Sequence, residues 1–114
     1  MNTIRHSCFA LLALALGLGI ARAADFTATW NGTTGNWNDA TKWSTNPTFP
    51  NNGVNTFDAI QSAGALTVNQ IIAIDGFTKT GGTTTLSGSN TLTSSTLSVF
   101  NAGTINGTGI YNAN

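Results

Sequence analysis

Single apolar residues alternate with small polar residues along much of this chain. From Asp25 to Trp30 the apolar residues Phe26, Ala28 and Trp30 occupy every second position. This period of two is typical of a half-buried strand. Further along, one aliphatic residue stands between small β-favouring or turn-forming residues, as in Thr85-Leu86-Ser87-Gly88. The pattern therefore predicts short strands rather than helices.

The second half of the chain repeats this short phrase several times. It appears at Ala65–Val68, Thr85–Gly88, Thr91–Ser94, Thr96–Val99 and Thr104–Gly107. Gly, Asn or Ser separate the phrases, as expected where the backbone turns sharply. Such repetition indicates brief strands stacked on one another and joined by tight corners. We predict an all-β, single-domain coil of about four to six rungs, each rung being one circuit of the chain.

The expected strands cover residues 55–61, 65–68, 70–74, 83–86, 91–93, 96–100 and 104–105. Within them, the aliphatic residues Leu86, Leu92, Leu97, Ile105 and Ile110 are expected to form a narrow inward core. Outward Thr and Ser would form hydroxyl ladders, with Gly or Asn at corners that need positive φ. The alternative for Thr78–Asn114 is a disordered linker, because its hydrophobicity is low. The open ends of such a coil would invite end-to-end self-association.

Residues 24–55 follow a different pattern and contain every tryptophan of the chain, Trp30, Trp37 and Trp43. Between the last two, residues 38–43 are predicted to form one helical turn capped by Asn38 or Asp39. We interpret the tryptophans as an N-terminal cap that seals the open end of the coil.

The alternative is a carbohydrate-binding module. Exposed rings of Trp30, Trp37 and Trp43 would then stack on sugars. The polar residues that would bind the sugar hydroxyls are Asn31, Asn36, Asn38 and Asp39.

The first 23 residues have the features of a cleaved signal peptide. Arg5 and His6 precede an apolar run from Cys8 to Ile20, and Ala21-Arg22-Ala23 gives the small-x-small pattern before cleavage between Ala23 and Ala24. A membrane anchor is the rival, but about 20 apolar residues are needed for a span and this run is shorter. We expect an exported protein, secreted or at the cell surface, with no membrane span after cleavage.

The residues after the signal peptide include few side chains that could take part in catalysis or bind a metal ion. The charged residues after the signal are Asp25, Asp39, Asp58, Asp75, Lys42 and Lys79. No basic patch predicts nucleic-acid binding. The aspartates are too scattered to predict an acid–base pair or the dense Gly/Asp repeats of calcium-binding coils. We therefore expect no enzyme activity, no catalytic residues, no metal and no cofactor.

Two stretches resemble a known family of bacterial surface proteins. The stretch from Phe77 to Thr91 reads FTKTGGTTTLSGSNT and resembles the autotransporter-associated β-strand repeat, which typically reads LTKTGxGTLTLSGxNT. This chain has Phe77 in place of the leading aliphatic residue and is one residue shorter between Gly81 and Leu86. The stretch from Thr29 to Ser44 is similar to the WxGxxGxW opening of many such proteins, including a third tryptophan.

The resemblance implies a secreted, right-handed parallel β-helix with an adhesive or matrix-like role. It supplies no catalytic residues. We therefore predict a signal peptide over 1–23, a Trp-rich cap over 24–55 and β-solenoid rungs over 56–114, with truncation from a longer protein at least as favoured as completeness. Expected partners are extracellular polysaccharide or other surface and matrix proteins.

Overall fold

The computed structural model describes residues 22–114. The predicted signal peptide therefore lies outside the described residues, except for Arg22 and Ala23. The described part is all-β, with a single short 3-10 helix, η1 (Ala40–Lys42). Its strands are β1 (Phe26–Thr29), β2 (Thr34–Asn36), β3 (Phe57–Gln61), β4 (Ala65–Val68), β5 (Ile72–Ile74), β6 (Gly76–Lys79), β7 (Thr83–Leu86), β8 (Thr91–Ser94), β9 (Ser98–Phe100), β10 (Thr104–Gly107) and β11 (Ile110–Ala113).

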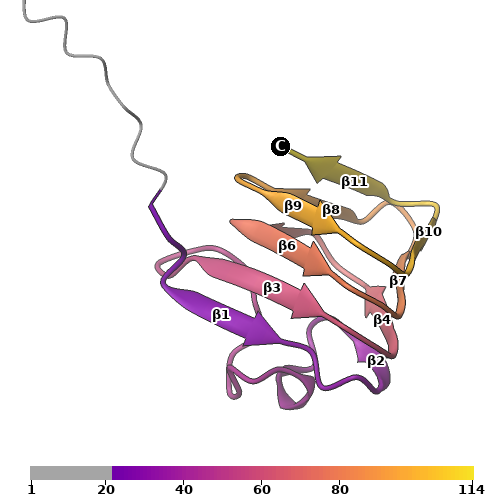
Figure 1. Cartoon of the computed structure of the whole chain (residues 1–114), viewed down its shortest axis with the longest axis horizontal. Helices are drawn as coiled ribbons and strands as arrows, with labels where there is room; N and C mark the ends of the chain where they lie inside the picture. Colours follow the sequence, from indigo (N-terminus) through magenta and orange to yellow (C-terminus); the bar gives the residue numbers. More distant parts are fainter. Residues whose placement is uncertain (1–21) are drawn as a thin grey trace, which may run out of the picture.

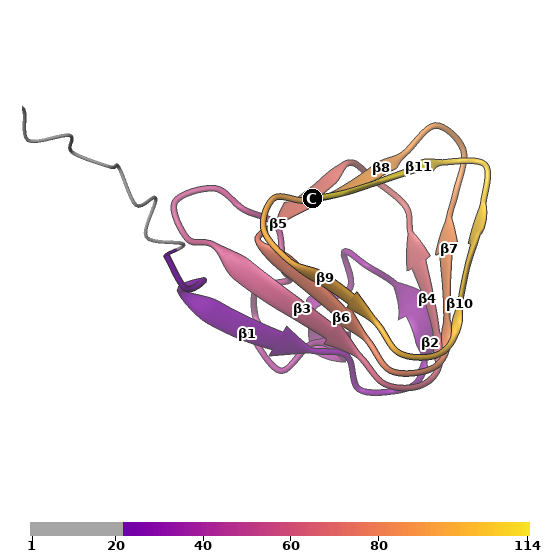
Figure 2. The same cartoon turned by 45° about the horizontal axis from the view of Figure 1, so that its top comes forward.

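The strands form three parallel sheets that the chain visits in rotation. Their strand orders are β1-β3-β6-β9, β2-β4-β7-β10 and β5-β8-β11. Figure 1 shows the first sheet facing the viewer, and Figure 2 shows the sheets as three sides of a triangle around the interior. We use the word rung for one passage through the sheets: β1–β2, β3–β5, β6–β8 and β9–β11. The prediction of an all-β stack of short strands is confirmed.

Parallel register places equivalent residues of successive rungs above one another. In the first sheet Ala28 pairs with Ala59, Ala59 with Phe77, and Phe77 with Ser98. The first three of these residues are completely buried. Because side chains alternate across a strand, the intervening residues point to the outer face. The interior is therefore a column of stacked side chains.

The register corrects the predicted core at two positions. Leu86 and Leu92 are buried as expected, but Leu97 is 67% exposed and Ile110 is 57% exposed. Ser98, not Leu97, lies in register with the buried Phe77, so Leu97 falls outside the interior. A shift of one residue moves a side chain to the other face of a strand.

The linker alternative for Thr78–Asn114 is wrong. Strands β7 to β11 lie in this segment, and each pairs with a strand of the preceding rung. Threonine and serine suit such strands because the core needs only one or two inward side chains per strand.

One corner is repeated at the end of the first sheet in each rung. Its glycines Gly64, Gly82 and Gly103 have φ of 76°, 70° and 94°. A Cβ on Gly82 would lie 2.5 Å from the Gly64 carbonyl oxygen, and one on Gly103 would lie 2.5 Å from that of Gly82. Glycine is therefore required for both its left-handed backbone and the close stacking of the corners.

Candidate binding sites

The three tryptophans form one buried cluster at the first rung. Trp30, Trp37 and Trp43 are 2%, 0% and 3% exposed. The ring centroid of Trp43 lies 5.1 Å from that of Trp30 and 4.9 Å from that of Trp37. Beyond the cluster, Trp37 also reaches Phe77 of the third rung at 5.9 Å. The sequence correctly identified residues that come together, although these rings offer no exposed face to a sugar.

Each indole nitrogen of the cluster donates a hydrogen bond to a backbone carbonyl. Trp30 Nε1 donates to Thr33 O at 3.0 Å, Trp37 Nε1 to Pro50 O at 2.7 Å, and Trp43 Nε1 to Trp37 O at 2.7 Å. The cluster is therefore satisfied internally, as buried indoles usually are.

The segment around Trp43 also runs antiparallel to the end of β1. Ser44 N donates to Thr29 O at 3.0 Å, and Asn31 N donates to Lys42 O at 2.9 Å. Trp30 and Trp43 form the bridge between them. This pairing covers the side of Thr29 that faces away from β3.

The four polar residues predicted to assist the tryptophans have other positions. Asn31 Oδ1 accepts from Thr33, and Asn38 bonds Asn69 and Gln70. Asn36 is exposed on β2. Asp39 is the N-cap of η1, where its Oδ1 accepts from Thr41 N at 3.1 Å and from Thr41 Oγ1 at 2.6 Å. The predicted helical turn and its capping residue are thus confirmed, with Asp39 rather than Asn38 as the cap.

A second set of side chains lies at the end of the first sheet, next to the stacked corners. Trp30, Gln61, Lys79 and Phe100 occupy equivalent positions of successive rungs. Gln61 Nε2 donates to Thr83 O at 2.9 Å and more distantly, at 3.3 Å, to Gly64 O. Trp30, Gln61 and Lys79 therefore donate to backbone carbonyls of the corners that follow them, whereas Phe100 has no donor and is 46% exposed in the last rung.

Lys79 is the charged member of this column. It is 1% exposed, and its Nζ donates to Gln61 Oε1 at 2.7 Å and to Gly81 O and Gly82 O at 2.9 Å each. All three acceptors are neutral, so burial lowers the pKa of the Lys79 ammonium below its usual value of 10.5. The three ammonium protons match the three acceptors, which indicates a structural role.

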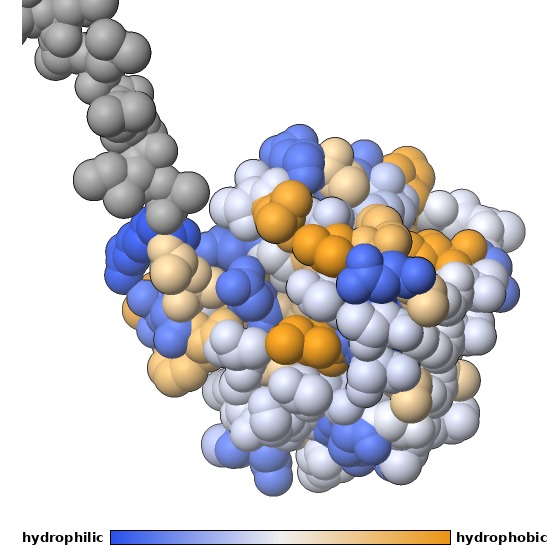
Figure 3. Space-filling model, in the orientation of Figure 1, coloured by the Kyte–Doolittle hydropathy of each residue, from blue (hydrophilic) through white to orange (hydrophobic). Residues whose placement is uncertain are grey.

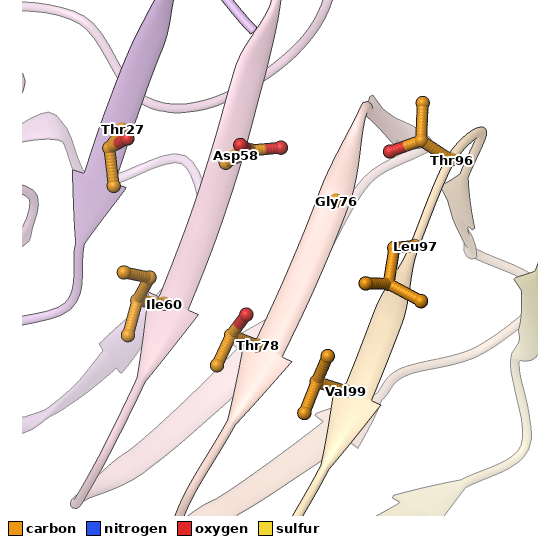
Figure 4. A pocket seen from close by; sticks show the side chains of 8 residues that line it. All are labelled: Thr27, Asp58, Ile60, Gly76, Thr78, Thr96, Leu97 and Val99. Carbon is orange, nitrogen blue, oxygen red and sulfur yellow. The ribbon is translucent and has the colours of Figure 1, made fainter. Parts of the chain in front are cut away.

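A hollow of about 240 Å³ lies on the outer face of the first sheet. Figure 4 shows its lining side chains, which come from β1, β3, β6 and β9 and from the segment just before β9. The lining residues are Thr27, Asp58, Ile60, Gly76, Thr78, Thr96, Leu97 and Val99. On this face, Figure 3 shows apolar residues, in orange, among pale residues of intermediate hydropathy.

Gly76 creates the hollow because it leaves one position of the face without a side chain. It stands in register with Asp58 of the neighbouring strand. A Cβ on Gly76 would lie 2.7 Å from Asp58 Oδ1 and 3.0 Å from the carbonyl oxygen of Leu97. Both oxygens therefore border the space that a side chain at position 76 would enter. The sequence pattern does not single out Asp58 and Gly76 as neighbours, so this site was missed.

The hollow carries one negative charge that the described residues do not neutralise. Within residues 22–114, the single ion pair joins Arg22 and Asp25 at 2.8 Å. Among those residues, the Asp58 carboxylate has no side-chain hydrogen bond or ion pair. It is half-buried beside the aliphatic side chains of Ile60, Leu97 and Val99.

Residues 22–114 contain neither a cluster of side chains suited to a metal ion nor a helix suited to cross a membrane. From residue 22 onward, no cluster of three or more His, Cys, Asp or Glu side chains is placed to hold a metal ion. No helix in residues 22–114 has the length and apolar character needed to cross a membrane.

Comparison with known proteins adds no relative. No family model, curated protein or solved structure matches the chain.

Proposed function

We propose that this chain is a structural, adhesin-like segment of an exported surface protein. The fold would be a right-handed parallel β-solenoid, with the tryptophan cluster as its N-terminal cap. The observation that supports this most is the rotation of the chain through three parallel sheets in register. Such a stack presents outer faces on a regular support, and repeat proteins use extended surfaces of this kind for binding.

Export forms part of the proposal and rests on the sequence of residues 1–23. The chain would be cleaved between Ala23 and Ala24 and reach the cell surface or the medium. Expected partners are surface polysaccharides or matrix proteins, together with further copies of the chain through end-to-end contacts. Enzyme activity has no place in this proposal.

The test combines location with adhesion. The full chain, expressed with its own signal in a diderm bacterium, should appear at the surface or in the medium and begin at Ala24 on N-terminal sequencing. Cells that carry it should adhere more strongly to polysaccharide or matrix-coated surfaces than cells with an empty vector. Cytoplasmic protein that retains Met1 would contradict export, whereas surface protein without adhesion would contradict only the adhesive role.

Carbohydrate stacking on the tryptophans is the second candidate, but no observation favours it. A sugar would have to displace rings that are at most 3% exposed and whose indole nitrogens are already hydrogen-bonded. Titration of the protein with a glycan array while tryptophan emission is recorded tests this candidate directly.

A further inference from the structure

The hollow above Gly76 is a preformed space and needs no movement of the backbone. Its floor is the buried Gly76, and the parallel register of β3, β6 and β9 fixes the wall residues that lie on these strands, while Thr96 and Leu97 come from the segment just before β9. Side chains at the ends of regular strands are held more rigidly than those of loops, so the spacing of the wall groups is set by the fold. The hollow therefore has the character of a small binding site.

The two polar atoms nearest the space above Gly76 are both acceptors, while the hydroxyls of Thr27, Thr78 and Thr96 also line the hollow. Asp58 Oδ1 and the Leu97 carbonyl oxygen border the space above Gly76. The Leu97 oxygen accepts one hydrogen bond, from Phe77 N at 3.2 Å, and a carbonyl can accept a second. A ligand that donates hydrogen bonds and carries positive charge would satisfy both oxygens.

Three aliphatic side chains form the apolar part of the wall. Leu97 is 67% exposed, and Ile60 and Val99 are partly exposed on the same outer face. Apolar surface beside a single carboxylate complements a ligand whose methylene chain ends in a cation. Lysine has this form, since its stem packs on apolar surface while its ammonium stays at a polar group.

We propose that this hollow binds the side chain of a lysine from a partner polypeptide, with the ammonium on Asp58 and the methylenes against Leu97 and Val99. Arginine fits less well, because the two acceptors nearest the space belong to different groups, Asp58 Oδ1 and the Leu97 carbonyl, whereas a guanidinium favours both oxygens of one carboxylate. A divalent cation would need more oxygen ligands than one carboxylate and one carbonyl provide. A sugar would lack an aromatic platform, since none of the lining residues is aromatic. The site lies on a side face and does not depend on the adhesive role proposed above.

The test uses two short peptides that differ only in charge. The probes are acetyl-Gly-Lys-Gly-amide and the same peptide with norleucine, titrated into the purified full chain at low salt. Backbone amide signals of Asp58, Thr78 and Val99 should shift saturably with the lysine peptide. Its association constant should exceed that of the norleucine peptide by about fivefold, which corresponds to ~1 kcal/mol for a half-exposed ion pair.

Variants then separate the two halves of the site. Asp58→Asn should abolish the preference for lysine, while Asp39→Asn, which removes the same charge at η1, should leave it unchanged. Leu97→Ser should weaken both peptides equally, because it removes the apolar wall and leaves the carboxylate. All three positions are exposed or half-buried, so each variant should melt close to the wild type.

Several results would overturn the proposal. Equal binding of the two peptides would show an apolar hollow without a role for Asp58, and equal loss in Asp39→Asn would show a general charge effect. Stronger shifts at Asp58 with calcium ions, an arginine peptide or a neutral hexose would assign the hollow to that ligand instead. No saturable shift with any probe would show that the hollow is not a binding site.

Discussion

The amide oxygen of Gln61 accepts a hydrogen bond from the buried ammonium of Lys79, with 2.7 Å between the two atoms. The two residues occupy the same position of consecutive rungs. Each side chain also donates to carbonyls of the corner that follows its own strand. Interior polar groups thus stabilise the corners, while the apolar side chains fill the space between the sheets.

Replacing Lys79 should test this role. Lys79→Met removes the ammonium that donates to Gln61 Oε1, Gly81 O and Gly82 O. Thr84 Oγ1 still donates to Gln61 Oε1 and Thr104 N to Gly82 O, so Gly81 O is the acceptor left without a donor. The free energy of unfolding should fall by ~1–3 kcal/mol. Lys79→Gln keeps a donating amide and should lose less. Lys42→Met is the matched control, expected within ~0.5 kcal/mol of the wild type. Urea denaturation measures all three, and a fully stable Lys79→Met protein would show that the corner carbonyls need no donor.

The same lysine predicts a dependence of stability on pH. Because burial lowers its pKa below 10.5, the unfolded chain binds more protons than the folded chain between the folded pKa and 10.5. The free energy of unfolding should therefore rise with pH in that window. Burial raises the pKa of Tyr111 above 10.0, which lowers stability mainly above pH 10.0, so measurements should stop there. Urea melts from neutral pH to pH 10.0 should show the rise in the wild type and not in Lys79→Met.

The tryptophan cluster gives a prediction about stability and emission. Trp37→Ala should cost ~3–5 kcal/mol, because it empties a completely buried position that contacts Trp43 and Phe77. Trp37→Phe keeps much of the ring but loses the bond to Pro50, so it should cost less. Thermal melts give the order of stability. Wild-type emission should be blue-shifted and unaffected by added glycans, whereas a solvent-exposed emission maximum would contradict burial of the rings.

Two glycines offer a matched pair for the corner. Gly82→Ala forces a side chain into a backbone with φ of 70° and against the Gly64 carbonyl oxygen, so it should destabilise the fold by ~1–3 kcal/mol. Gly53→Ala meets nothing within 4 Å and has no positive φ, so it should be within ~0.5 kcal/mol of the wild type. Thermal or urea melts of both variants test the stacked corner. Equal stability would show that the corners tolerate a wider spacing.

The strands are predicted best from the sequence where the short repeated pattern of one aliphatic residue among small polar residues is present. Strands β4 and β7 match the expected bounds. The buried residues of β4 are Leu66 and Val68, and those of β7 are Thr84 and Leu86. Strands β2 and β6 contain or begin with glycine and were not expected. Their extended form is imposed by pairing with β4 and β3, which local propensity cannot reveal.

The candidate site was harder to predict, because it depends on which strands lie side by side. Asp58 and Gly76 are distant in sequence and become neighbours only through the register of β3 and β6. The burial of Lys79 could not be predicted from the pattern of apolar and polar residues either, because lysine is almost never fully buried without a partner. The tryptophans were identified as a group because their large apolar surfaces must be covered wherever they meet.

The antiparallel contact between Ser44 and Thr29 makes the first rung different from the later ones. It covers the Thr29 end of the side of β1 that faces away from β3, while the later rungs pair on the other side. In a stack where each rung contacts only its neighbours, assembly proceeds from a nucleus outward. We expect the first rung, which contains the tryptophan cluster, to fold first. The later rungs would then pair with it one after another, in chain order.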